Sequence, residues 1–370
     1  MDFKELLKPN IKGQDREVIA KLRRSSCPVI LYGAAGDIAD RIAIKLARHG
    51  LSVAAIAVDE DCPAAVTDAP TLSGAQLCTV AEIEANYPAC HVLAGFVKGY
   101  ARTAEIAQKF SNAKSVDYLS EIFDMEEIEP SFIIENRDFL EDFYERLSDS
   151  LSKDSFVAYL LSKIHQDMRF IPPYFDKKQY FPDGIFRLSD HESYFDCGAF
   201  TGDTIAGFLE ATRGAYRRIW AAEPDRSNYQ SLERFAKEQR LANIELINKG
   251  IYSHAGRLPF QEEGSMLSMI AENAQNYIEV DTIDRLVAGR PVTYIKLDVE
   301  GAEQQALEGA ERTILENHPL LGISIYHKQQ DLINIPAYLK KLVPEYRFYF
   351  RVHKKLAIDT VMYAVAERHA

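Results

Sequence analysis

The chain has 370 residues, of which 47% are apolar and 26% charged, and its 43 Lys and Arg against 55 Asp and Glu give a net charge of −12. This length suits two compact domains or three, and the composition is that of a globular rather than a disordered protein. Phosphate backbones and anionic membranes bind basic surfaces, so the acidic balance argues against both as the main partner. No apolar run approaches the ~20 residues of a membrane span, and the start MDFKELLKPN is not a secretory signal. We therefore expect a soluble, cytoplasmic protein that binds neither nucleic acid nor membrane.

Residues 28–59 have the pattern of a strand, a turn, a helix and a second strand. PVILYGAAG ends in a Gly-rich turn, DIADRIAIKLARHG has the apolar spacing of a helix, and LSVAAIAVDED is a second apolar run. Apolar and helical segments then alternate to about residue 120. This alternation predicts a smaller amino-terminal Rossmann-like α/β domain, which we place at residues 1–124.

The turn of this first unit carries an incomplete dinucleotide-binding pattern. Gly33, Gly36 and Ala39 give G-x-x-G-x-x-A, and Asp59 follows the second strand. With a helix amino end facing a phosphate, the unit would bind a nucleotide or sugar nucleotide. Alternatively, the glycines only allow a tight turn in a structural scaffold, which we favour because the full G-x-G-x-x-G is missing.

Between residues 125 and 190 the alternation stops. Residues 131–170 are rich in helix formers with apolar residues three and four positions apart, and Pro172-Pro173 ends this stretch. Residues 177–192 resemble a loop or small hairpin. We expect a helical connector over 125–190 that packs against one or both domains.

From residue 191 to the end, the sequence again alternates between apolar strands and helical segments. Five expected strands end at or near polar residues, which are Asp196, Glu223, Asn248, Asp298 and His327. YRFYFRV and TVMYAVAE follow as a final pair with no helix between them. This pattern predicts an α/β domain over residues 191–370 with a seven-stranded Rossmann-like methyltransferase sheet that closes in an antiparallel hairpin.

The turn after the first of these strands is acidic. Asp196, Gly198, Gly202 and Asp203 are spaced D-x-G-x-x-x-G-D, with no Lys or Arg between them. Two carboxylates would repel a pyrophosphate but suit a cationic ligand such as S-adenosylmethionine. Glu223, at the tip of the next strand, is placed to accept hydrogen bonds from ribose hydroxyls. The alternative is that these acids are helix caps in another kind of α/β enzyme.

Several blocks in this half of the chain occur together and in order. They are FDCGAFTGDT, AAEPD, VDTIDRL, YIKLDVEGAE and ISIYHK. In this combination the chain closely resembles the FkbM family of S-adenosylmethionine-dependent methyltransferases, over about residues 180–366. Many members have Asn where this chain has Phe200, so contacts of that side chain are not carried over.

The resemblance implies a cofactor site formed by six residues, which are Asp196, Gly198, Gly202, Asp203, Glu223 and Asn248. The first three would hold the methionine part of S-adenosylmethionine and Asp203 its polar end. Glu223 would bind the ribose, and Asn248 would lie near the adenine.

The resemblance also implies that Asp298 faces the methyl-transfer cleft, with Glu300 one turn on. Independently, strand ends in open α/β sheets line the ligand crevice, and alternation puts Lys296 on the same face as Asp298. His327 is the best candidate for a general base because its ordinary pKa is near neutrality, with Asp298 second. Lys296 and Glu300 could instead form a structural ion pair. We expect Glu303 on a helix surface or in the first turn.

These features favour methyl transfer to a hydroxyl of a sugar, glycan or small natural product by in-line displacement. A nicotinamide- or sugar-nucleotide-dependent enzyme that uses the first unit is the alternative, as is a binding protein without activity. We expect no metal, since no dedicated ligand cluster is visible, although Asp298 and Glu300 are two neighbouring carboxylates. The expected partner is a small-molecule or glycan acceptor, and homo-oligomerisation is left open.

Overall fold

The computed structural model describes residues 14–33, 37–60, 75–96, 101–119, 128–165, 170–171, 174–261, 269–270, 276–353 and 359–367. The chain divides into two compact units. Among the described residues, the first unit takes in the stretch up to residue 130 together with residues 160–170. The second takes in residues 131–159 and the chain from residue 171 onward. None of the described helices is long and apolar enough to cross a membrane.

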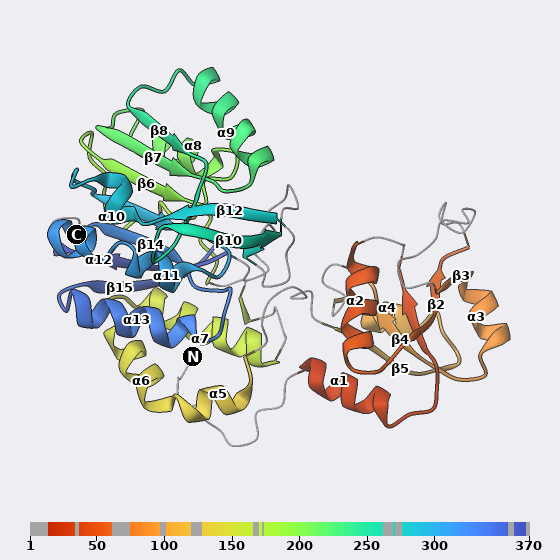
Figure 1. Ribbon diagram of the computed structural model, residues 1–370. Helices are drawn as coiled ribbons and strands as arrows, with labels where there is room; N and C mark the ends of the chain where they lie inside the picture. Colours follow the sequence, from red (N-terminus) through yellow and green to blue (C-terminus); the bar gives the residue numbers. More distant parts are fainter. Residues whose placement is uncertain are drawn as a thin grey trace. The chain divides into compact units, whose positions relative to one another are not determined.

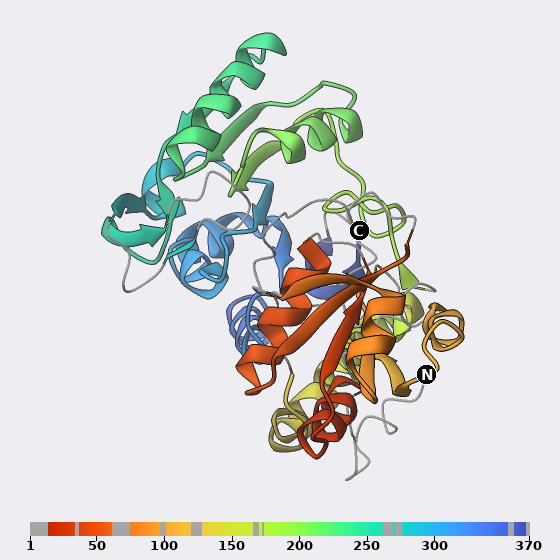
Figure 2. The ribbon, with the colours of Figure 1, turned by 90° about the vertical axis from the view of Figure 1, so that its right-hand side faces the viewer.

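The first unit contains a five-stranded sheet in the order β3-β2-β1-β4-β5, with all neighbours parallel (Figures 1 and 2). Its strands are β1 (Val29–Tyr32), β2 (Val53–Val58), β3 (Gln76–Thr79), β4 (Cys90–Ala94) and β5 (Ala113–Tyr118). This is the doubly wound α/β order 3-2-1-4-5-6 without its sixth strand. The parallel sheet predicted for the amino-terminal part is therefore confirmed.

Two separate hydrophobic clusters cover the two faces of this sheet. Side chains of α1 (Gln14–Arg23) and α2 (Asp37–Arg48) pack with Leu31, Ile56 and Leu93 in one cluster. Side chains of α3 (Val80–Asn86) and α4 (Thr103–Ala107), with Ile30 and Val92, form the other. Because neighbouring residues of a strand point to opposite faces, the nearly continuous apolar runs of these strands supply both clusters.

Three helices occupy the stretch expected to be a helical connector. They are α5 (Pro130–Glu135), α6 (Arg137–Arg146) and α7 (Ser150–His165). The loop before α7 is bonded to strand β15 (Arg347–Val352), since Ser148 N donates to Phe348 O at 2.9 Å. Arg351 Nη2 and Asp149 Oδ2 add an ion pair at 2.6 Å. The expected start of this connector at residue 125 lies outside the described parts of the chain, as does Pro172-Pro173.

The second unit is built on a seven-stranded sheet in the order β15-β16-β14-β13-β6-β7-β8 (Figure 1). The strands that accompany β15 are β6 (Ser193–Cys197), β7 (Arg218–Ala222), β8 (Ile244–Ile247), β13 (Tyr294–Leu297), β14 (Leu320–Ser324) and β16 (Thr360–Val365). Strands β14, β13, β6, β7 and β8 are parallel, and β16 pairs antiparallel with both β14 and β15. The predicted sheet and its closing hairpin are confirmed.

Helices connect these strands, and an additional small sheet interrupts the alternation. The helices are α8 (Asp203–Ala211), α9 (Arg226–Glu238), α10 (Ile283–Val287), α11 (Glu303–Glu308), α12 (Glu311–Asn317) and α13 (Asp331–Leu342). The additional sheet contains β9 (Gly250–Ile251), β10 (Gly256–Gln261), β11 (Met269–Ile270) and β12 (Asn276–Asp281). This sheet was not predicted from the sequence, because β9 and β11 have two residues each and β10 contains Gly256 and Pro259, which are unfavourable in strands.

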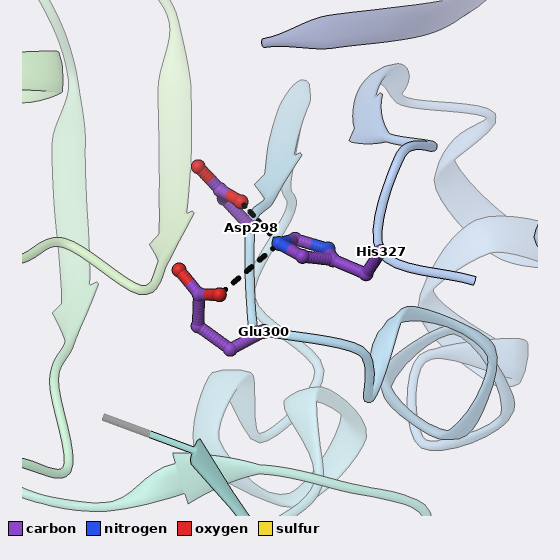
Figure 3. A group of neighbouring side chains, drawn as sticks. All are labelled: Asp298, Glu300 and His327. Carbon is purple, nitrogen blue, oxygen red and sulfur yellow. Dashed lines mark ion pairs between the residues drawn. The ribbon is translucent and has the colours of Figure 1, made fainter. Parts of the chain in front are cut away.

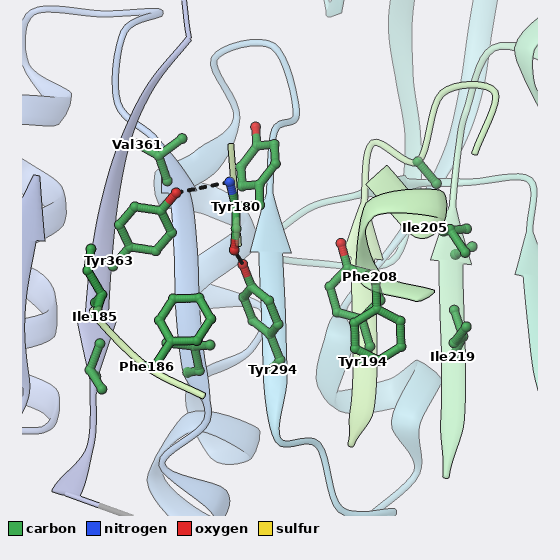
Figure 4. Packing of buried hydrophobic residues seen from close by; sticks show 14 of the residues in the cluster. Tyr180, Ile185, Phe186, Tyr194, Ile205, Phe208, Ile219, Tyr294, Val361 and Tyr363 are labelled. Carbon is green, nitrogen blue, oxygen red and sulfur yellow. Dashed lines mark hydrogen bonds between the residues drawn. The ribbon is translucent and has the colours of Figure 1, made fainter. Parts of the chain in front are cut away.

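An aromatic cluster covers one face of the seven-stranded sheet (Figure 4). Tyr194 of β6 stacks on Phe208 of α8 with ring centroids 4.4 Å apart. The loop at Tyr180 crosses the sheet and is held there by two buried hydrogen bonds: Tyr294 Oη donates to its carbonyl at 2.6 Å, and its amide donates to Tyr363 Oη at 2.9 Å. A loop between α7 and β6 thus becomes part of the core and brings its tyrosine to the centre of the sheet.

Candidate functional site

Polar side chains gather along the carboxyl edge of the seven-stranded sheet. In the parallel order β8-β7-β6-β13-β14, the strands are followed by Asn248, Glu223, the Gly198 turn, Asp298 and His327. Parallel strands present their carboxyl ends at the same edge, so residues far apart in sequence meet there. The structure thus brings the predicted strand-end residues into a single row.

Two glycines shape the turn between β6 and α8. Gly198 has φ +79°, and a Cβ added to it would lie 1.9 Å from Asp298 O. Gly202 has φ +100°, and its Cβ would lie 2.4 Å from the ring of Phe235. Any side chain at these positions would push β13 or α9 away. The glycines therefore let the turn lie against the tip of the neighbouring strand, as a backbone that approaches a ligand requires.

Glu223 is bound directly to this turn. Its Oε2 accepts a hydrogen bond from Phe200 N at 3.0 Å, and its Oε1 accepts one from Asp225 N at 2.9 Å. Asn248 Nδ2 donates to the carbonyl of Glu223 at 2.9 Å, which joins the tips of β7 and β8. Burial raises the pKa of Glu223 to about 7, although the two amide donors oppose this shift.

The buried Asp196 forms an ion pair with Lys296 across the β6–β13 pair. Asp196 Oδ1 and Lys296 Nζ are 3.1 Å apart, and their side chains are 0% and 2% exposed. Thr204 Oγ1 donates to Asp196 Oδ2 at 2.6 Å, while Lys296 Nζ also donates to Gly198 O at 2.6 Å. Burial raises the pKa of Asp196. Burial lowers and Asp196 raises the pKa of Lys296, with a net shift upward.

This ion pair settles one alternative left open by the sequence. Lys296 pairs with Asp196, and Glu300 contacts His327 instead of Lys296. The charge of Asp196 is balanced locally, so Asp196 supports the turn from inside the sheet. Asp203, by contrast, is exposed at the first residue of α8.

Asp298, Glu300 and His327 converge at the tips of β13 and β14 (Figure 3). His327 Nε2 lies 3.2 Å from Glu300 Oε2 and 3.7 Å from Asp298 Oδ1. The side chains of Asp298, Glu300 and His327 are 20%, 28% and 11% exposed. Glu300 has φ +52°, a left-handed backbone conformation that is uncommon for a residue with a side chain.

Glu303 is the buried neighbour on the other side of the imidazole. It is in the first turn of α11, one of the two positions expected for it, and its side chain is buried, with 0% exposed. Its Oε1 lies 3.0 Å from His327 Nδ1 and also accepts a hydrogen bond from Val299 N at 2.9 Å. The spacing of the K-x-D-x-E-G-A-E block placed Glu303 on a helix but gave no sign of a histidine folded against it.

Two tyrosines that the sequence did not single out fix the carboxylate of Asp298. Tyr180 Oη donates to Asp298 Oδ2 at 2.8 Å and is within 2.8 Å of Ser324 Oγ. Tyr326 Oη donates to Asp298 Oδ1 at 3.3 Å. Tyr326 could have been found as part of the Y-H-K block after β14, whereas Tyr180 sits in a loop with no motif.

The ionisable side chains of this group shift one another's pKa values. Burial lowers the pKa of His327, but the carboxylates of Glu303, Glu300 and Asp298 raise it well above its usual value. Burial raises the pKa of Asp298, whereas Lys296 and His327 hold it below its usual range. Burial also raises the pKa of Glu300. The surrounding carboxylates thus favour the protonated form of the His327 imidazole and make it less suited than an isolated histidine to accept a proton by itself.

The first unit has its own polar group at a strand edge. Asp59, after β2, accepts hydrogen bonds from Tyr32 Oη and Lys109 Nζ, each at 2.7 Å. Gly33, the first glycine of the incomplete dinucleotide-binding pattern, lies against the backbone of Gly95. A Cβ added to Gly33 would be 2.9 Å from the carbonyl oxygen of Gly95. Gly36 and the side chain of Ala39 lie outside the described residues.

Comparisons with known proteins point to one domain type in the second unit. The family model described as "Methyltransferase FkbM domain" matches residues 196–349. The methyltransferase FkbM from Methylobacillus flagellatus KT is similar in fold, with a TM-score of 0.79 and 22% identity over 98% of this chain and 96% of that one. No curated protein matches the sequence.

Two other solved structures match only about half of this chain. An rRNA methylase from Streptococcus thermophilus has a TM-score of 0.32 and 17% identity over 49% of this chain and 90% of that one. Fibrillarin from Aeropyrum pernix, solved with natively bound S-adenosyl-L-methionine, has a TM-score of 0.31 and 15% identity over 49% of this chain and 70% of that one. Function is therefore inferred from the match to the methyltransferase domain model and from the residues of the site.

Proposed function

Because residues 196–349 carry a methyltransferase domain of the FkbM family, we propose that the protein transfers a methyl group from S-adenosylmethionine to a hydroxyl. The acceptor class that we propose is a sugar, a glycan or a small natural product. The net charge of −12 disfavours a nucleic-acid acceptor. The observation that carries the proposal is the hydrogen bond between Glu223 and the glycine turn. It places a carboxylate that would bind the ribose hydroxyls next to the backbone that would hold the methionine part of the cofactor.

S-adenosylmethionine would lie along the row from Asn248 to Gly198. The ribose hydroxyls would donate to the free lone pairs of Glu223, whose oxygens each already accept one backbone hydrogen bond. Asn248 borders the same position on the adenine side, since its amide is bonded to the Glu223 carbonyl. Gly198 and Gly202 would hold the methionine part, and the exposed Asp203 would meet its ammonium group.

The acceptor hydroxyl would bind beside Asp298, Glu300 and His327, next to the glycine turn. In the reaction the hydroxyl oxygen forms a bond to the methyl carbon, the carbon–sulfur bond breaks, and S-adenosylhomocysteine leaves with the electron pair. Alignment of oxygen, carbon and sulfur supplies much of the acceleration. The hydroxyl proton enters the Asp298–Glu300–His327 group, which we treat as one coupled acid–base unit rather than as a single base.

An acceptor panel tests the hydroxyl proposal. The protein is incubated with methyl-labelled S-adenosylmethionine and matched pairs of acceptors, each pair with the same skeleton and either a hydroxyl or an amine. We expect label in the hydroxyl compounds, with one equivalent of S-adenosylhomocysteine formed per methyl group transferred. Transfer to the amine members alone would refute O-methylation and leave methyl transfer intact.

The raised pKa of Glu223 predicts that cofactor affinity depends on pH. Ribose hydroxyls donate to the ionised carboxylate, so binding favours loss of its proton, and affinity for S-adenosylhomocysteine should rise as the pH rises through about 7. Below that pKa, one proton is lost on binding, so the affinity should rise by up to about tenfold for each pH unit. Titration calorimetry at about one pH unit on either side of this pKa of about 7 measures the change.

Glu223→Gln provides the matched variant for this measurement. It removes the titrating group, so we expect weaker binding with no rise across the same pH range. If the native chain and Glu223→Gln show the same pH dependence, Glu223 does not contact the cofactor.

A further inference from the structure

We propose that Asp298, Glu300 and His327 form a binding site for one divalent metal ion at the acceptor end of the cleft. Their ligand atoms all lie within 4.8 Å of one another, although they come from the ends of two different strands. Binding of the ion does not require a cofactor or an acceptor. Its participation in methyl transfer does rest on the proposed function.

The distances within the group are close to those between ligands of a shared ion, with the His327–Asp298 distance somewhat longer than expected. Ligand atoms in such a site lie about 2.1 Å from a small divalent ion, with ligand–ion–ligand angles between a right angle and the tetrahedral angle. The ligand atoms are then roughly 3.0–3.4 Å from each other. His327 Nε2 lies 3.2 Å from Glu300 Oε2 and 3.7 Å from Asp298 Oδ1. Neither ring nitrogen makes a well-aligned hydrogen bond within the described parts of the chain, despite these short contacts. The carboxylates flank the nitrogen instead of accepting a directed hydrogen bond from it.

The surrounding residues orient each ligand from behind. Glu303 occupies the Nδ1 side of His327 at 3.0 Å, which leaves Nε2 directed toward Glu300 and Asp298. A carboxylate on the far side of a ligating histidine is a common arrangement at metal sites. Tyr180 likewise holds Asp298 Oδ2 at 2.8 Å and leaves Oδ1 to face His327 (Figure 3).

The charge around the group is strongly negative. Four carboxylates interact with His327 or with each other, namely those of Asp298, Glu300, Glu303 and Asp331. Lys296 is engaged by Asp196, and Lys328 donates to Gly301 O. A protonated His327 and the nearby Lys296 offset only part of this charge, and burying several anions together is costly unless cations compensate them. A divalent ion would supply two positive charges where the carboxylates converge.

The donor set indicates the class of ion. Two carboxylates and one imidazole combine ligands that suit Mg²⁺ and Mn²⁺ with a ligand that suits Zn²⁺ and Fe²⁺. Mn²⁺ accepts both types and is detected by electron paramagnetic resonance, so it is the probe. When bound, such an ion would act as a Lewis acid on the acceptor hydroxyl and promote loss of its proton.

The test measures Mn²⁺ binding to the full-length chain without cofactor or acceptor, after treatment with a chelator. We expect one Mn²⁺ per chain, with binding at least tenfold weaker in Asp298→Asn and Glu300→Gln. Glu300 has the most exposed side chain of the group, so Glu300→Gln is the variant with the least risk to folding. Glu316→Gln, an exposed acid on α12, is the matched control and should bind Mn²⁺ like the native chain.

A thermal shift with S-adenosylhomocysteine is measured on the same samples and separates the two proposals. If Mn²⁺ does not bind, or binds equally well to the native chain and to Glu300→Gln and Asp298→Asn, the metal site is refuted. That outcome combined with a normal S-adenosylhomocysteine shift leaves the proposed function intact. Specific Mn²⁺ binding without any shift from S-adenosylhomocysteine would instead support the metal site and contradict the methyltransferase proposal.

Discussion

Replacing Lys296 by Met is expected to lower the free energy of unfolding of the second unit by about 3–5 kcal/mol. Met nearly matches the length of the Lys side chain but leaves the carboxylate of Asp196, which is 0% exposed, without its partner at 3.1 Å. The substitution also removes the donor to Gly198 O. Trp220 in β7 is the chain's one Trp and is buried in the same sheet, so its fluorescence follows the unfolding of this unit in denaturant.

Two further variants make this prediction specific. Lys237→Met on the exposed face of α9 should change stability by no more than about 0.5 kcal/mol. The double variant Asp196→Asn/Lys296→Met should be more stable than Lys296→Met, because no buried charge is left unpaired. If Lys296→Met were as stable as the native chain, the ion pair would not hold the strand tips together.

Asp298→Asn and His327→Ala are expected to slow methyl transfer by about 10²–10⁴-fold. Both changes remove part of the group that takes up the proton of the acceptor hydroxyl. The cofactor contacts proposed at Glu223 and the glycine turn are untouched, so affinity for S-adenosylhomocysteine should stay within about threefold of the native value. Single-turnover rates and calorimetry on the same preparations measure the two effects separately.

Glu223→Ala is the contrasting variant for this division of roles. It should weaken S-adenosylhomocysteine binding by about tenfold or more, since one charge-assisted hydrogen bond is worth about 1.5–3 kcal/mol. Equal losses of cofactor affinity in Glu223→Ala and His327→Ala would contradict the assignment of cofactor and acceptor to different ends of the cleft.

The strand ends could be predicted because their signals are local. Apolar runs that stop at Asp196, Glu223 and Asp298 indicate buried parallel strands, and such strands share one carboxyl edge. The glycines at 198 and 202 likewise marked a turn, and both have positive φ. The order of the central strands follows from this class of fold, so neighbours along the edge could be anticipated.

The pairing of side chains could not be predicted, because it depends on contacts between distant segments. Lys296 had Glu300 nearby in sequence, yet it pairs with Asp196 on the adjacent strand because the β6–β13 register puts the two opposite each other. Tyr180 reaches Asp298 only because its loop is bonded across the sheet to Tyr294 and Tyr363. Neither contact leaves a periodic pattern in the sequence.

The choice of His327 as general base also depended on contacts that the sequence does not reveal. His327 was chosen for the ordinary pKa of histidine, but Glu303, five residues after Asp298, lies against its ring and helps to raise its pKa. A histidine's chemistry depends on the carboxylates around it, and these become visible only in the fold. For this reason we assign the acceptor proton to the group of Asp298, Glu300 and His327 rather than to His327 alone.

Thermal unfolding with S-adenosylhomocysteine, followed by Trp220 fluorescence, tests the central claim most directly. A ligand at about 100 times its dissociation constant adds about 2.7 kcal/mol to the free energy of unfolding. We expect such stabilisation from S-adenosylhomocysteine in the native chain and a much smaller one in Glu223→Ala, with no comparable effect of NAD or UDP-sugars. No stabilisation by S-adenosylhomocysteine together with a clear effect of NAD would contradict the assignment of this site to a methyltransferase.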